Sequence, residues 1–105
     1  MNQLLKYQEI TTKCIPRIDF HIHTTWTDGA NSAREMYESA VSYGLERILF
    51  SEHARKTSEE WFHRFASEIR ALPKGGCEAF VGVETKVVDL DGNLDCTPNI
   101  ISDCD

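Results

Sequence analysis

The chain has 105 residues, of which 41% are hydrophobic, and its formal net charge is −6. This length allows one small domain, and the composition is typical of a globular protein. The acidic balance argues against nonspecific binding of nucleic acid, whose phosphates need Lys and Arg, but it does not exclude a metal site that handles phosphate.

The cysteines and the N-terminal segment indicate a compartment. Cys14, Cys77, Cys96 and Cys104 form no C-x-x-C pair, which argues against a zinc ribbon or a thioredoxin-like site. Met1 to Glu9 has too few bulky apolar residues for a signal peptide, and no apolar run approaches the length of a membrane span. We therefore expect a reduced, cytoplasmic protein with free thiols and no membrane partner.

Strand and helix signals alternate from the first predicted element onward. Ile15 to Phe20 is an apolar stretch that predicts a buried strand. Ser32 and Glu35 have capping-box spacing and precede apolar residues at helical spacing, so we predict a helix there that ends at Gly44. Glu46 to Phe50 predicts a second strand, which Ser51-Glu52-His53 follows.

The same alternation continues through the second half of the chain. Thr57-Ser58-Glu59-Glu60 has the spacing of another capping box, and the helix that it predicts closes at Pro73. Ala79 to Val83 predicts a third strand, which Glu84 follows. A turn at Asp91-Gly92-Asn93 then predicts a hairpin or excursion, and Thr97-Pro98 predicts the start of a last helix.

Chemically active side chains follow the ends of these strands. Strands that alternate with helices predict an α/β fold with a parallel sheet and right-handed crossovers. Functional groups in such sheets gather beyond the carboxyl ends of the strands. His21 and His23, then His53, then Glu84 fall at the ends of three successive predicted strands.

The segment Asp19-Phe20-His21-Ile22-His23-Thr24-Thr25-Trp26-Thr27-Asp28-Gly29 predicts a metal site. Residues i and i+2 of a strand point to one face, so both histidines can reach one point, and Asp28 can return to it from the following loop. Imidazole and carboxylate together suit Zn, Mn or Fe. We predict metal ligation by His21, His23, Asp28, His53 and Glu84, with Glu84 placed to bridge two metals.

Each of these residues also has an ordinary structural role open to it. The histidines could lie at strand ends or beside a helix, Asp28 could start a turn with Gly29, and Glu84 could be a solvated carboxylate.

Several other polar and aromatic residues are assigned to structure. His63 is expected to be a solvated helix residue, and Trp61, Phe62 and Phe65 to be core aromatics. Asp89, Asp91, Asn93 and Asp95 fit a polar turn better than a calcium loop, since Gly92 is fourth rather than sixth from Asp89. Glu52 and Arg55 flank His53 and could support the metal ligands, with no role assigned.

At three places the sequence resembles the PHP (polymerase and histidinol phosphatase) domain family. Asp19 to Thr24 with Thr27-Asp28-Gly29 resembles its first motif, Ser51-Glu52-His53 its second, and Gly82-Val83-Glu84 the region that carries a bridging glutamate. The resemblance implies a distorted (β/α)7 barrel. It also implies two or three Zn, Mn or Fe ions, a metal-bound hydroxide as nucleophile, and phosphoester hydrolysis in which the five residues above are metal ligands.

The resemblance also implies an incomplete domain. Residues 1–105 would be a single partial PHP domain, with its motifs in 19–105 and truncated after about half of the barrel, because the family's later motifs have no counterpart here. An open half-barrel exposes strand edges and half a core. We therefore expect self-association or pairing with the missing C-terminal half.

Three functions remain open. The main expectation is metal-dependent hydrolysis of a small phosphomonoester, such as a histidinol-phosphate-like substrate, with no catalytic residue assigned beyond the metal ligands. The alternatives are a non-catalytic metal-binding remnant and a polymerase-associated or nuclease-type PHP domain. The acidic charge and the lack of a basic stripe disfavour nucleic acid as a partner. An amidohydrolase-like enzyme shares His-x-His, but the surrounding residues fit it poorly.

Overall fold

The computed structural model describes residues 16–105. Cys14 and the start of the first predicted strand at Ile15 lie outside this range. Within it, the elements in chain order are β1 (Ile18–Ile22), α2 (Ala33–Ser42), β2 (Arg47–His53), η1 (Lys56–Ser58), α3 (Glu59–Arg70), β3 (Glu78–Glu84) and α4 (Pro98–Ser102).

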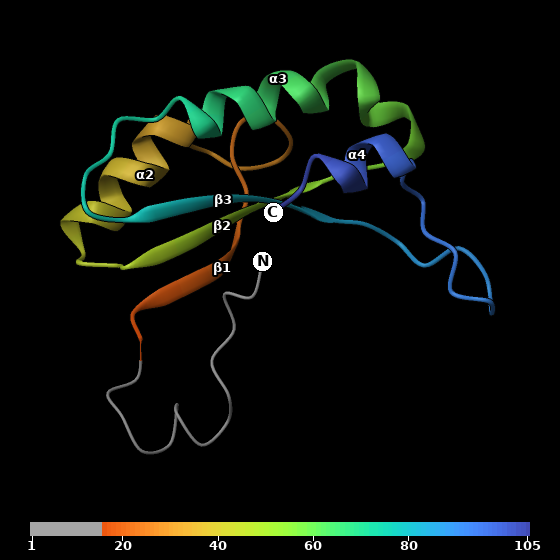
Figure 1. Cartoon of the computed structure of the whole chain (residues 1–105), viewed down its shortest axis with the longest axis horizontal. Coiled ribbons are helices and arrows are strands. Elements are labelled where there is room, and N and C mark those ends of the chain that lie inside the picture. The colour runs from red at the N-terminus through yellow and green to blue at the C-terminus, as the bar shows by residue number, and fades with distance from the viewer. Residues whose placement is uncertain (1–15) are drawn as a thin grey trace.

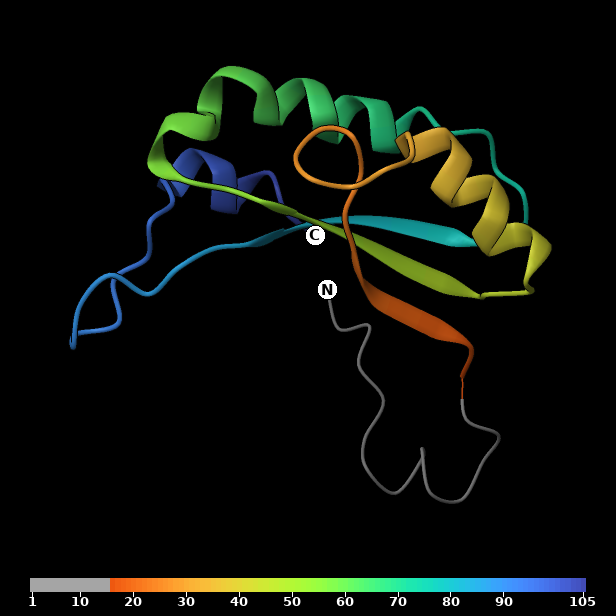
Figure 2. The same cartoon turned by 180° about the vertical axis from the view of Figure 1, so that it is seen from behind.

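The strands form a parallel sheet in the order β1-β2-β3. The prediction of an α/β fold with parallel strands is therefore confirmed. Helices α2 and α3 lie on the same face of this sheet (Figure 1), and the view from behind shows no described helix on the opposite face (Figure 2). Because the strands are parallel, their carboxyl ends lie together at one edge of the sheet.

The predicted strand bounds need correction. The first strand was expected over Ile15 to Phe20, but in the structure it continues to Ile22, so that His21 lies within it. The second strand was expected to end at Phe50 and instead ends at His53. Both strands run further because polar residues follow the apolar run without a turn signal, while the ladder of backbone hydrogen bonds continues through them.

The core lies between the sheet and the helices on its covered face. From the strands it takes Ile48, Phe50 and Val81, all fully buried, and from α3 it takes Phe62 and Phe65, also fully buried. Burial of each such side chain stabilises the fold by about 1.5–3 kcal/mol. The expectation of core aromatics is confirmed for the two phenylalanines, while Trp61 is partly buried against this cluster.

Two of the predicted helix starts have the expected caps. At α2 the Ser32 side chain accepts a hydrogen bond from the Glu35 N–H at 3.1 Å, and Glu35 accepts one from the Ser32 N–H at 3.0 Å. Thr97 caps α4 by accepting from the Ile100 N–H at 3.3 Å. Past the end of α2, Gly44 has a φ of +75°, which favours glycine there.

The capping box predicted at Thr57 is wrong. Lys56–Ser58 form a 3-10 turn, and α3 begins only at Glu59. The reason is local, because the Ser58 hydroxyl accepts a hydrogen bond from the Arg55 N–H at 2.9 Å and closes a tighter turn before the helix.

The segment 86–95 is an excursion from the sheet, and it projects away from the body of the molecule in Figure 1. Val87 and Leu94 form an isolated antiparallel bridge across it. At its tip the Asp89 carboxylate accepts hydrogen bonds from the Asp91 N–H at 2.9 Å and from the Asn93 side chain at 2.8 Å. The hydrogen bonds from Asn93 hold the pKa of Asp89 below its usual range. These bonds agree with the expected polar turn.

The described cysteines are free thiols, as expected. Cys77 and Cys96 are buried, and Cys104 is half-buried. Burial raises the pKa of Cys104 to about 11, so this thiol is protonated at neutral pH and is a poor nucleophile. Among residues 16–105, no helix is long and apolar enough to cross a membrane.

Candidate metal centre

All five predicted site residues meet at the carboxyl edge of the sheet. His53 and Glu84 are the last residues of β2 and β3 and are partners in the strand register. His21 lies in β1, and His23 follows its end. Asp28 comes from the loop between β1 and α2, so three strand ends and one loop supply the cluster.

An irregularity in β1 decides where its histidines point. Asp19 pairs with Ile48, but after a register shift Ile22 pairs with Phe50. Three steps along β1 therefore match two along β2, as in a β-bulge. Without the shift His21 would pair with Phe50, whose side chain is in the core. With it, Ile22 takes the core position, and the histidines on either side of Ile22 point to the opposite face.

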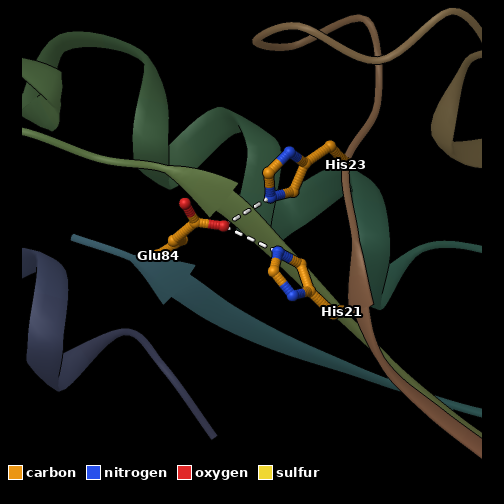
Figure 3. A group of neighbouring side chains, drawn as sticks. All are labelled: His21, His23 and Glu84. Carbon is orange, nitrogen blue, oxygen red and sulfur yellow. Dashed lines mark hydrogen bonds and ion pairs between the residues drawn. The ribbon is translucent and has the colours of Figure 1, made fainter.

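One group of side chains consists of His21, His23 and Glu84 (Figure 3). The Glu84 Oε1 atom lies 2.6 Å from His21 Nε2 and 3.1 Å from His23 Nε2. The three candidate ligand atoms lie within 4.8 Å of one another. Imidazole and carboxylate atoms at this spacing could hold a single divalent ion after small shifts.

A second group consists of His23, Asp28 and His53. His23 Nδ1 lies 2.9 Å from Asp28 Oδ1, and His53 Nε2 lies 3.0 Å from Asp28 Oδ2. The second oxygen of Glu84 lies 3.4 Å from His53 Nδ1. Glu84 therefore presents one oxygen toward His21 and His23 and the other toward His53.

The donor set fits a transition-metal ion. Three imidazoles and two carboxylates suit Zn, Mn or Fe, as the sequence predicts. Desolvation opposes ionisation of Asp28, but the hydrogen bond from His23 and the charge of His53 lower its pKa below the usual value. The hydrogen bond from His21 lowers the pKa of Glu84 in spite of desolvation. Both carboxyls are thus ionised near neutral pH, as metal ligation requires.

A buried carboxylate organises the loop that carries Asp28. Glu52 is fully buried and points to the opposite face from His53, its neighbour in β2. Its oxygens accept hydrogen bonds from the Thr24 N–H at 3.0 Å and the Thr27 hydroxyl at 2.7 Å, and also from the Thr24 hydroxyl. The role of Glu52 could not be assigned from sequence, although a charged residue at a core-facing position of a strand was a signal for it.

Gly29 allows the same loop to close on itself. A Cβ at Gly29 would lie 2.6 Å from the carbonyl oxygen of His23 and 2.7 Å from the Cα of Thr24, closer than real Cβ atoms come. The Gly29 N–H donates to the Thr24 carbonyl at 2.8 Å. The glycine is required here by close backbone contact, and Asp28 is held next to it.

Replacement of Gly29 by alanine is therefore expected to weaken metal binding. The new methyl group must push the loop away from the backbone of His23, which costs about 1–3 kcal/mol as other overpacking changes do and moves Asp28. Calorimetric titration with Mn²⁺, with urea unfolding of the metal-free chain, measures both effects. Ala30→Gly, at the neighbouring exposed position, is the control and should leave the affinity unchanged. Equal affinities for Gly29→Ala and the unchanged chain would contradict this account.

His63 lies apart from the cluster. It is exposed on α3, and its Nδ1 atom lies 2.7 Å from Asp103 of the segment after α4. The expectation of a solvated histidine agrees with this position. Arg55 is exposed and, with Lys86, lines a cavity beside His53 and Glu84. Sequence reasoning gave Lys86 no role, although it lies two positions after the predicted ligand Glu84.

Comparison with known proteins shows similarity to part of a longer enzyme. Over 96 residues the chain is 33% identical to the DNA polymerase/3'-5' exonuclease PolX of Bacillus subtilis (strain 168). The match covers 83% of this chain and 16% of PolX, so the chain spans about a sixth of that protein's length. No family model matches the chain. The chain is thus similar to a small part of an enzyme that acts on DNA.

Proposed function

We propose that this chain is the opening part of a PHP-type domain that hydrolyses phosphodiester bonds of nucleic acid with divalent metal ions. The proposal rests on one observation. Five potential metal ligands lie together at the carboxyl edge of a parallel sheet: His21, His23, Asp28, His53 and Glu84. Similarity to PolX, named as a polymerase and exonuclease, supports an enzyme of the polymerase-associated or nuclease type.

The ligands fall into two overlapping sets. His21 and Glu84 would hold one ion, and Asp28 and His53 a second, with the two oxygens of Glu84 shared between them. A neutral imidazole has one free lone pair, so His23 would serve one ion only, through Nε2 or Nδ1. Metal ions in such a centre lower the pKa of bound water and stabilise the charge that develops on phosphate.

The (β/α)7 barrel fold is also part of this proposal. Three parallel strands with helices on one face have the arrangement expected at the start of a (β/α)7 barrel whose uncovered face becomes the barrel interior. Residues 1–105 would be a partial domain, and further strands would add ligands and close the exposed edges. A metal-binding remnant without turnover is the alternative that this incompleteness keeps open.

The proposed substrate differs from the main sequence expectation. A small phosphomonoester such as a histidinol-phosphate-like compound was inferred from the family resemblance, and neither the structure nor the similarity to PolX supports it. Similarity to PolX favours nucleic acid instead, which the net charge of −6 had disfavoured. Net charge is a weak guide here because bound cations reverse the field of a carboxylate cluster.

The test combines metal binding with hydrolysis. The purified chain should bind Mn²⁺ or Zn²⁺ and should cleave a labelled DNA oligonucleotide faster than p-nitrophenyl phosphate, and chelation should stop the cleavage. His21→Ala should lose both properties, while His63→Ala, which removes an exposed histidine outside the cluster, should retain them. Metal binding without hydrolysis of either compound would favour the remnant. Absence of metal binding would reject the proposed function.

A further inference from the structure

A cavity of about 360 Å³ adjoins the metal centre. One wall comes from the end of β2 and the residues after it, and the other from the end of β3 and the residues after it. Its lining residues are His53, Ala54, Arg55, Glu84, Thr85 and Lys86. Because His53 and Glu84 also belong to the metal centre, a substrate held at the metal ions can extend directly into this space.

Asp95 ties the two walls of the cavity together. Its carboxylate accepts a hydrogen bond from the Lys56 N–H at 3.1 Å, on the side of β2. On the side of β3, its carbonyl accepts from the Thr85 hydroxyl at 2.8 Å, and its N–H donates to the Lys86 carbonyl at 2.8 Å. The excursion 86–95 thus returns to fix the backbone of both walls.

The cavity presents two cationic side chains. Arg55 and Lys86 are exposed, and among residues 16–105 neither makes an ion pair with a carboxylate. Their backbones are fixed, because the Arg55 N–H donates to the Ser58 hydroxyl and the Lys86 carbonyl is bound by Asp95. A guanidinium fork and an ammonium on fixed backbone suit a phosphate group.

We propose that Arg55 and Lys86 bind a phosphate of a nucleic-acid strand next to the phosphate that is cleaved. This inference rests on the proposed function, in which the scissile phosphate lies at His53 and Glu84. A phosphomonoester has no second phosphate for the two cations, whereas a strand supplies one at every nucleotide. The pair therefore selects a phosphodiester strand over a small monoester, and it supplies the local positive charge that the overall composition lacks.

The test is the salt dependence of binding. A fluorescein-labelled phosphorothioate oligothymidylate, which resists hydrolysis, is titrated by anisotropy in Mn²⁺ at several salt concentrations. Arg55→Gln with Lys86→Gln should weaken binding about 10-fold or more at low salt. It should also reduce the slope of log K against log salt by about 0.7 for each phosphate that the variant no longer neutralises. The matched control is Arg64→Gln with Lys74→Gln, which removes two exposed cations away from the cavity and should leave the slope unchanged.

The outcomes separate this inference from the proposed function. Equal losses in both double variants, or no loss in either, would overturn the phosphate site, whether or not Mn²⁺ binds. If the unchanged chain binds no metal but its oligonucleotide binding still depends on Arg55 and Lys86, the phosphate site stands and the metal-dependent function fails. Strong metal binding with no measurable oligonucleotide binding would support the metal centre and reject the phosphate site.

Discussion

Replacement of His23 by alanine is expected to weaken metal binding by about 100-fold or more. His23 is the one side chain in both candidate groups, with Nε2 beside Glu84 and Nδ1 beside Asp28. Loss even of residues that only orient metal ligands costs about 10–100-fold in affinity, and loss of a ligand itself should cost at least as much. Metal content after gel filtration and calorimetric titration with Zn²⁺ or Mn²⁺ measure the change.

Thermal unfolding gives a second view of the same variant. A ligand at 100 times its dissociation constant stabilises the folded state by about 2.7 kcal/mol, so the unchanged chain should unfold at a higher temperature when metal is added. His23→Ala should lose most of this increase. His63→Ala is the matched control, because His63 is exposed and pairs with Asp103 at 2.7 Å outside the cluster, and it should keep the full increase. The same metal-induced stabilisation in both variants would exclude His23 from the ligand set.

The sequence predicts where the site lies because strand ends in a parallel sheet are fixed by a simple rule. His53 and Glu84 follow apolar runs, and parallel pairing brings such ends together whatever the detailed register. The same rule placed His21 and His23, although β1 ends later than expected. The family resemblance names the same four residues and adds Asp28 from a loop, and the structure brings all five together.

The features that the sequence could not predict depend on contacts between distant segments or on a local choice between alternative hydrogen bonds. Within the register shift between Asp19 and Ile22, the His21 N–H donates locally to the Asp19 side chain at 3.0 Å, but the result of the shift, Ile22 beside Phe50 in the core, depends on pairing with a distant strand. The 3-10 turn before α3 forms because the Ser58 hydroxyl accepts a hydrogen bond from the Arg55 N–H. The capping-box spacing at Thr57 does not predict this bond. Pairing of β2 with β3 brings the walls of the cavity together, and a further tie comes from Asp95, which returns to Lys56, 39 positions away in sequence.

Local charge reconciles the acidic composition of the chain with the proposed site for an anionic strand. Asp28 and Glu84 contribute two negative charges to the site, and two divalent ions would more than neutralise them. Arg55 and Lys86 then add positive charge at the side of the cluster, while Arg34, Arg47 and Arg70 are engaged in ion pairs elsewhere. Among residues 16–105, Glu84 is the acidic residue that lines the cavity, so the net charge of the chain does not describe this surface.

Replacement of Glu52 by alanine is expected to destabilise the metal-free chain by about 2–4 kcal/mol. The buried Thr24 N–H would lose its acceptor, which costs about 1–3 kcal/mol, and the lost side-chain volume adds a cavity penalty. Glu52→Gln keeps the shape and one carbonyl acceptor for that N–H, so its cost should be smaller, about 1–2 kcal/mol. Urea unfolding in the presence of a chelator measures both variants.

The metal affinity of Glu52→Gln separates a role in the site from a role in stability alone. The hydrogen bonds of Glu52 go to Thr24 and Thr27, which precede Asp28 in the loop that delivers it. Looser attachment of that loop should weaken Mn²⁺ binding by about 10-fold even under conditions in which the variant is fully folded. Glu38→Gln, an exposed change on α2 that breaks the ion pair with Arg34, should change neither quantity by more than about 0.5 kcal/mol. If Glu52→Gln unfolds more easily but binds Mn²⁺ as tightly as the unchanged chain, Glu52 supports the fold and not the position of Asp28.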